Sequence, residues 1–224
     1  MPTIAIIGAG PGMGQAIARV FGARGYNVAL IARTAAKVEA LAAELDHDGI
    51  PAASFPADVL DHDALTAALD ATRAHFGSID VLEYSPAGAE AMAGIKRVSQ
   101  ATPADIQREI DVQLYGALAA TRAVLPSMLD AGEGTVIVTT GAGSVDPNPM
   151  LGNITPAGAA LRNWAISMHK ELVESGVQVA HAAIGVWIGD GAPEGVPTAT
   201  ADQIAPMYWE LHTNHDLAEK VFTI

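Results

Sequence analysis

Short apolar runs alternate with longer segments of helical periodicity along all 224 residues, and this alternation limits the fold more than any other feature. Strands joined by helices must run parallel, and helices then cover both faces of the sheet. We therefore predict a single domain over residues 1–224, an α/β fold with a doubly wound parallel sheet in three layers. The predicted strands are 3–7, 26–32, 52–56, 79–84, 135–140, 177–184 and 221–224, and the predicted helices are 13–24, 34–46, 61–76, 102–128, 156–174 and 201–212.

Local signals refine two parts of this pattern. Thr102 has the side chain of an N-cap, Pro103 follows at the first helical position and Asp105 lies in the first turn, so a helix begins there. We expect this helix to bend near Pro126. Residues 185–200 are rich in glycine and proline without periodicity, which predicts a loop over the site.

Composition excludes several classes of protein. Twelve Lys and Arg residues against 25 Asp and Glu give a net charge of −13, which argues against binding to nucleic acid or to an anionic membrane surface. Cysteine is absent, so disulfides and thiol chemistry are excluded. No apolar run is long enough for a membrane span, and no signal peptide precedes the first strand, so we expect a cytoplasmic protein. His212, His215 and Asp216 lie at a helix end, and we predict no metal site.

A glycine-rich loop joins the first predicted strand to the first predicted helix. Glycine is needed where the backbone turns tightly and approaches a pyrophosphate, and the helix N-terminus offers unpaired N–H groups to that anion. The position of the loop between strand and helix predicts a dinucleotide site on a Rossmann-type fold. The residues assigned to it are Gly8, Gly10, Pro11, Gly12, Met13 and Gly14.

The end of the second predicted strand indicates which dinucleotide binds. An acid for the ribose 2′-hydroxyl of NAD is usual there, but this chain has Ala32 followed by Arg33. A guanidinium can hold a 2′-phosphate through two hydrogen bonds, and Lys37 adds charge one helical turn later. We therefore predict NADP (NADPH) as the cofactor, bound by Arg33, Thr34 and Lys37. A solvated Arg33 and a loose cofactor preference remain the alternative.

The chain resembles the short-chain dehydrogenase/reductase family over nearly all of its length. Besides the glycine loop, the segments that carry the resemblance are Ala57-Asp58-Val59, Asp80-Val81-Leu82, 111–116, 156–161 and Ile184-Gly185. The resemblance implies that Asp58 and Val59 bind the adenine and that Gly185 lies beside the nicotinamide. Ser85, Pro86 and Trp187 complete the expected cofactor site.

The resemblance breaks at the family's Asn-Ser-Tyr-Lys catalytic set. Gln113 stands in the asparagine place and Thr140 in the serine place, and both keep a polar group. Ile154 and Gly158 stand in the tyrosine and lysine places, and no Tyr-x-x-x-Lys occurs elsewhere. A positioned acid–base group contributes roughly 10²–10⁴ in rate, so another group must supply it or the reaction differs. We therefore expect an atypical member of the family.

Four side chains are candidates for the missing catalytic role. Thr140 and Asn153 keep hydrogen-bonding groups nearest the expected hydride path. Tyr84 lies at the end of the predicted strand 79–84, and Tyr115 lies near the end of the 111–116 segment. A structural hydrogen bond is the competing interpretation for each. Glu83 lies inside a predicted strand, and we expect it to turn toward solvent or to pair with a cation.

The leading function is an NADPH-dependent reduction of a small organic carbonyl, imine or activated alkene. A cyclase, isomerase or lyase on the same scaffold, and a non-catalytic NADP-binding protein, remain alternatives. The substrate pocket is expected between residues 86–101 and 185–200. Relatives in the family commonly pair through long helices, so we expect a homodimer or homotetramer. The helical residues expected at that interface are Leu114, Leu118, Val124, Leu161, Trp164 and Met168.

Overall fold

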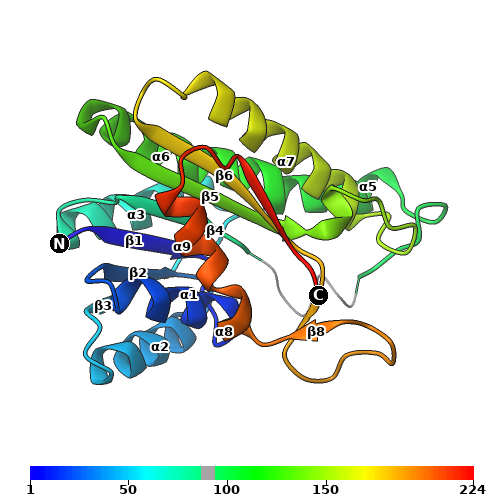
Figure 1. The fold of residues 1–224 in the computed structure, drawn as a ribbon, viewed down its shortest axis with the longest axis horizontal. Coiled ribbons are helices and arrows are strands. Elements are labelled where there is room, and N and C mark those ends of the chain that lie inside the picture. The colour runs from blue at the N-terminus through cyan, green and yellow to red at the C-terminus, as the bar shows by residue number, and fades with distance from the viewer. Residues whose placement is uncertain (87–93) are drawn as a thin grey trace.

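A seven-stranded parallel sheet organises the molecule, and the computed structural model describes residues 1–86 and 94–224. The strand order is β3-β2-β1-β4-β5-β6-β9, and the carboxyl ends of the strands lie at the right of Figure 1. This confirms the predicted doubly wound α/β fold. The strands are β1 (Thr3–Ile7), β2 (Asn27–Ile31), β3 (Ala52–Ser54), β4 (Val81–Tyr84), β5 (Gly134–Gly141), β6 (Val177–Ile184) and β9 (Glu219–Phe222).

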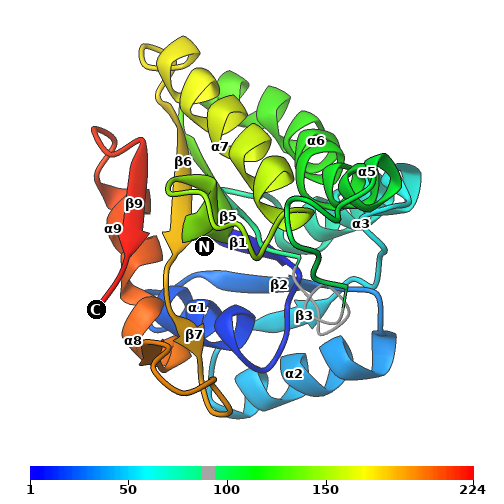
Figure 2. The same cartoon turned by 90° about the vertical axis from the view of Figure 1, so that its right-hand side faces the viewer.

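Helices form a layer on each side of the sheet (Figure 2). One layer holds α1 (Met13–Gly22), α2 (Ala35–His47), α8 (Ala201–Ile204) and α9 (Pro206–Thr213). The other holds α3 (His62–Phe76), α6 (Gly116–Ala131) and α7 (Ile154–Glu171), with α5 (Pro103–Glu109) ahead of α6. Every predicted strand and helix is present, with boundaries within three residues of those expected.

The apolar runs of the sequence are buried on both faces of the sheet. All five residues of β1 and of β2 are buried. Alternate residues point to opposite faces, so Ile4 and Ile6 pack under α1 and α9 whereas Ala5 and Ile7 pack under α3 and α6. This two-sided burial explains why the strands are continuously apolar rather than alternating.

The helix after Thr102 confirms one local prediction and corrects another. Thr102 accepts a hydrogen bond from the Asp105 N–H, and the Asp105 carboxylate accepts one from the Thr102 N–H, so the expected cap is present. The single helix expected over 102–128 is divided into α5 and α6, and α6 continues through Pro126. The irregular part lies between them, in a single π-helical stretch from Ile110 to Tyr115.

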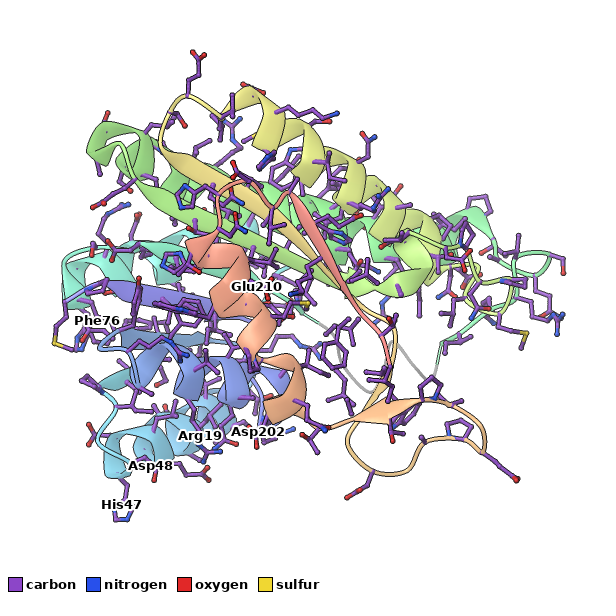
Figure 3. All side chains as sticks on the ribbon, viewed as in Figure 1. Arg19, His47, Asp48, Phe76, Asp202 and Glu210 are labelled. Carbon is purple, nitrogen blue, oxygen red and sulfur yellow. The ribbon has the colours of Figure 1, made fainter. Side chains whose placement is uncertain are left out.

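The loop after β6, one surface ion pair and the character of the helices complete the description of the fold. The loop expected at residues 185–200 contains two short paired strands, β7 (Trp187–Ile188) and β8 (Thr198–Ala199). Arg19 on α1 pairs with Asp48 after α2 at 3.4 Å, and Figure 3 labels both side chains on the outer side of these helices. Within the described ranges, no helix has the length and apolar character needed to cross a bilayer.

Glu83 corrects an expectation, because its carboxyl group neither reaches solvent nor forms the ion pair expected of it. The side chain is fully buried between β4 and α9. Its two oxygens accept hydrogen bonds from Thr139 at 2.8 Å and from Ser85 at 2.9 Å, and Thr139 also bonds the hydroxyl of Tyr208 at 2.9 Å. Burial raises the pKa of the Glu83 carboxyl to about 8, against the lowering effect of these two hydroxyls.

We predict that Glu83→Gln stabilises the protein selectively at alkaline pH. The native pKa of Glu83 lies above its value in the unfolded chain, so its stabilising contribution is present at low pH and is lost as pH rises through about 8. Glutamine keeps the shape without ionising. Thermal unfolding should show the variant gaining melting temperature over wild type between pH 6 and pH 9.

The exposed Glu174→Gln is the matched control and should show no such trend. A stability difference between Glu83→Gln and wild type that stays constant with pH would contradict a buried titrating carboxyl.

Candidate active site

The loops after β1 and β4 meet so closely that only glycine fits at position 8. Gly8 has φ +94°, and a Cβ there would lie 2.6 Å from the Ser85 carbonyl oxygen and 2.7 Å from Pro86. The N–H groups of Gly8 and Ala9 both donate to the Ile31 carbonyl oxygen. The glycine loop is therefore held between the carboxyl ends of β2 and β4, where the direction of strand succession reverses. Such a switch point is where open α/β sheets bind ligands.

A pocket of about 420 Å³ opens at this place. The glycine loop forms one wall, the residues after β2 form another, and the residues after β3 form a third. Nine of the residues assigned to the cofactor from the sequence line it: Gly8, Gly10, Pro11, Arg33, Thr34, Lys37, Asp58, Val59 and Pro86. These nine residues are the ones assigned to the adenosine and phosphate parts of a dinucleotide, and their role in binding it stays a prediction.

The other assigned cofactor residues do not line this pocket. Gly14 packs against the loop instead, since a Cβ there would lie 2.9 Å from the Ala9 Cα. The Ser85 hydroxyl is directed to Glu83, and Trp187 donates its ring N–H to the Asp190 carbonyl at 2.9 Å. Gly185 packs against Phe222 and Thr223 of the C-terminal segment. Gly12 and Met13 begin α1 beside the pocket without lining it.

Four residues that sequence reasoning missed also line the pocket. Leu60 follows the adenine segment, and Arg108, Glu109 and Val112 come from α5 and the π-helical stretch. No local motif marks them, because they reach the site through the packing of a helix some fifty residues later in the chain. Arg108 and Glu109 add one charge of each sign to the rim.

A second cluster gathers around Gly158, which stands in the family's lysine place. A Cβ at Gly158 would lie 3.3 Å from the Gln113 side-chain oxygen, 3.4 Å from the Ser144 Cβ and 3.6 Å from the Thr140 Cβ. Gln113 in turn donates to Glu109 at 3.0 Å. The structure therefore brings the two polar replacements, Gln113 and Thr140, together and links them to the nucleotide pocket through Glu109.

Thr140 belongs to a buried chain of hydrogen bonds that includes a histidine missed by sequence reasoning. The Thr140 hydroxyl lies 2.7 Å from the Ser144 hydroxyl and 2.7 Å from His181 Nε2. His181 Nδ1 lies 2.9 Å from the Glu219 carboxylate, which also pairs with Arg162. The signal that was available is a single histidine inside the mainly apolar strand β6.

The charges in this chain are set by burial and by pairing. Burial lowers the pKa of His181, while Glu219 acts to raise it. The hydrogen bond from Arg162 lowers the pKa of Glu219 and raises that of Arg162. At neutral pH the pair Arg162–Glu219 is therefore ionised, and His181 is mainly neutral.

Asn153 is held by the backbone of a neighbouring segment. Its side-chain oxygen accepts from the Lys96 N–H at 2.9 Å, and its amide donates to the Gly94 carbonyl at 3.2 Å. Gly152 adds a further hydrogen bond to the Lys96 carbonyl at 2.7 Å. Asn153 thus anchors residues 94–96, which belong to the predicted substrate-pocket segment 86–101; residues 87–93 of that segment lie outside the described residues.

The two candidate tyrosines do not join Thr140. Tyr84 is buried, and its hydroxyl donates to the Val112 carbonyl. Burial raises the pKa of this phenol well above its ordinary value. Tyr115 is 45% exposed and lines an outer groove between α3 and α6, together with His62 and Arg122.

Metal coordination finds no support in the part of the chain that the structure describes. No three His, Asp or Glu side chains there lie close enough to hold an ion. Both ring nitrogens of His212 are within hydrogen-bond distance of hydroxyls, from Tyr26 at 2.7 Å and from Thr135 at 2.8 Å. His212 therefore ties α9 to the sheet.

Comparison with known proteins decides the family. The sequence profile of short chain dehydrogenases matches residues 2–192. Serine 3-dehydrogenase from Agrobacterium fabrum is 31% identical over 224 aligned residues, which cover 92% of this chain and 86% of that protein. The chain belongs to the short-chain dehydrogenase family. The match spans only 56% and 49% of the length of two other curated relatives.

Solved structures agree with this assignment. A metagenomic short-chain oxidoreductase in complex with NADP is 27% identical to this chain, with a TM-score of 0.82 and coverage of 100% of this chain and 97% of that one. L-Sorbose reductase from Gluconobacter frateurii, complexed with NADPH and L-sorbose, shares the fold at 19% identity, with a TM-score of 0.85 and coverage of 99% and 94%.

We predict that Gly8→Ala destabilises the protein and closes its pocket. Alanine at φ +94° is strained and collides with the backbone at Ser85 and Pro86, so the free energy of unfolding should fall by about 1–3 kcal/mol. Denaturant unfolding and nucleotide titration measure the two effects.

Gly10→Ala is the matched control, because a Cβ at Gly10 meets nothing within 4 Å. Its stability should stay close to that of wild type. Equal stability of the two variants would show that the approach at Gly8 imposes no constraint.

Proposed function

We propose that the chain is an NADP(H)-dependent oxidoreductase that reduces a small organic carbonyl, imine or activated alkene without a tyrosine–lysine couple. The observation that carries this proposal is that Arg33, Thr34 and Lys37 line the same pocket as the glycine loop and Asp58. The basic residues come directly after β2, where a ribose 2′-phosphate would lie. Ala32 supplies no carboxylate to repel it.

The residues present fit the cofactor. The crowded approach at Gly8 leaves a cradle lined by backbone, and the Asp58 side chain is fixed by the Leu60 N–H at 3.0 Å. Arg33 and Lys37 would hold the 2′-phosphate, and Asp58 and Val59 would hold the adenine. The metagenomic short-chain oxidoreductase in complex with NADP supports binding of a nicotinamide dinucleotide here, and the preference for NADP rests on Arg33 and Lys37. When bound, NADPH supplies a hydride to the substrate.

The substrate end of the site is proposed to lie around Thr140, Ser144 and Gly158. Two hydroxyls take the place of a phenol there, and Gly158 leaves no ammonium group to lower a neighbouring pKa. Such a site suits a substrate whose reduced form is a stable anion or is protonated through a hydroxyl. Asn153 contributes by fixing the wall at residues 94–96.

A homodimer or homotetramer is part of the proposal. Val124 and Leu161, two of the residues assigned to the interface, are buried in this chain's own core. The other four keep part of their surface exposed on the same helices and would form the contact: Leu114, Leu118, Trp164 and Met168.

We predict that NADPH binds more tightly than NADH and that Arg33→Asp removes or reverses the difference. The substitution replaces the proposed phosphate ligand by a group that repels it. NADPH at 100 times its Kd should stabilise wild type by roughly 2.7 kcal/mol, or about 5–10 °C in Tm. Calorimetric titration with both nucleotides is the measurement.

Arg122→Asp makes the same charge change on the outer face of α6 and should keep the preference for NADPH. Equal affinities of wild type for NADPH and NADH, or no binding of either, would refute the NADP assignment.

We predict hydride transfer that depends on Thr140 and little reduction of simple ketones. The assay is a substrate screen with stereospecifically deuterated NADPH, using wild type, Thr140→Val and Asn153→Ala. Thr140→Val should lose 10²-fold or more in rate, because valine keeps the shape without the hydroxyl. Asn153→Ala should mainly raise KM, because it removes the two hydrogen bonds that hold the wall at residues 94–96.

Robust ketone reduction unaffected by both substitutions would show that the active site lies elsewhere. Product without deuterium transfer would indicate a cyclase, isomerase or lyase instead.

A further inference from the structure

A continuous chain of polar side chains connects the outer side of α7 with the hydroxyls near Gly158. Arg162 on α7 pairs with Glu219 on β9, with 2.9 Å between its Nη2 and the Glu219 Oε1. Glu219 Oε2 lies 2.9 Å from His181 Nδ1, and His181 Nε2 lies 2.7 Å from the Thr140 hydroxyl. The Ser144 hydroxyl follows at 2.7 Å. Three strands of the sheet, helix α7 and the 3₁₀ turn Ala142–Ser144 therefore contribute to one chain.

The ionised Glu219 fixes where the protons of this chain lie. A carboxylate only accepts hydrogen bonds, so neutral His181 must carry its proton on Nδ1. Nε2 is then an acceptor, and the Thr140 hydroxyl donates to it at 2.7 Å in preference to the Gly141 carbonyl oxygen, which lies 3.1 Å from the same hydroxyl. Thr140 in turn accepts from Ser144. The hydroxyls of Ser144 and Thr140 thus both donate toward His181, and the unprotonated Nε2 of His181 can take a proton from Thr140.

We propose that His181, positioned by Glu219, stores the proton of the reaction and exchanges it with the substrate through the hydroxyls of Thr140 and Ser144. This inference rests on the proposed function, because it assigns the acid–base group of the same site. The nearest sequence candidates for that role were single side chains, whereas the structure offers a relay of three.

Each proton move balances in both directions. In reduction, the Ser144 Oγ–H bond breaks as the substrate oxygen or nitrogen takes the proton. The Thr140 hydroxyl then gives its proton to Ser144, and protonated His181 gives its Nε2 proton to Thr140. His181 changes from imidazolium to imidazole, and no atom of the relay is oxidised or reduced. After product leaves, a hydronium ion from solvent gives a proton to Ser144, which passes to His181 by the same route, and a water molecule remains. Oxidation runs the same moves in reverse.

A merely structural chain would not require a histidine in this position. His181 is fully buried in β6, where burial disfavours its charged form. The charged groups that act on it are Glu219 from β9, which favours the imidazolium, and Arg162 from α7, which disfavours it. At the other end, Thr140 and Ser144 are each 7% exposed, so the relay ends at the edge of the molecule's interior.

The first test follows the His181 ring by NMR in protein with labelled histidine nitrogens, with NADPH absent. His181→Gln assigns its signals. Neutral His181 should carry its proton on Nδ1. Glu219→Gln should lower the His181 pKa by one unit or more, and Arg162→Met should raise it. Loss of packing would not move the pKa in opposite directions in these two variants. His212, bonded to two hydroxyls, is the internal control and should not shift.

The second test uses the substrate found by the deuterium screen. The rate of reduction should fall as pH rises through the His181 pKa, and that midpoint should move down in Glu219→Gln and up in Arg162→Met. Thr140→Ser should restore most of the rate that Thr140→Val loses, because serine keeps the hydroxyl. His181→Gln should flatten the pH profile while NADPH affinity stays within a few-fold of wild type.

A neutral His181 protonated on Nε2, or a pH midpoint that ignores both charge variants, would overturn the relay. Absence of any hydride transfer by wild type would refute the proposed function instead, and the NMR shifts would still decide whether Glu219 sets the proton of His181.

Discussion

The close approach of two loops at Gly8 is the constraint on which the candidate site depends. Strand succession runs from β1 outward to β3 and then returns to β4 on the other side of β1, so the loops after β1 and β4 diverge toward opposite layers. Their backbones touch where they part, with the Ser85 carbonyl 2.6 Å from the place of a Gly8 Cβ. The 420 Å³ pocket exists because no side chain fills this point.

The second constraint is the absence of a side chain at Gly158. A lysine there would have to pass between Gln113 and Ser144, whose atoms lie 3.3 and 3.4 Å from the place of its Cβ. Those polar groups instead approach one another, and Thr140 reaches both Ser144 and His181. The same packing therefore accommodates glycine in the lysine place and the buried chain of hydrogen bonds from Ser144 through Thr140 to His181.

The sequence predicted the fold, and it placed the residues of the glycine loop and Arg33 around one pocket, because both depend on local patterns. Apolar runs and the glycine loop have fixed spacings, and the basic Arg33 follows its strand directly. Arg108 and His181 could not be predicted in the same way, since each reaches its place through contacts between distant elements. Glu83 was misjudged because a carboxyl in a strand is usually solvated or paired, whereas here two hydroxyls and a raised pKa allow its burial.

Adjacent threonines on β5 show why only one of the two buried polar networks suits proton exchange. Thr139 faces α9 and joins Glu83 and Tyr208, while Thr140 faces α7 and joins His181. Burial raises the pKa of Glu83 to about 8 although two hydroxyls bond its carboxyl group, so this group stays protonated at neutral pH. His181 has a carboxylate beside it that stabilises the imidazolium, and that carboxylate is itself held by Arg162. The first network therefore keeps its proton and holds α9 on the sheet, and the second can release a proton and recover it within a narrow range of pH.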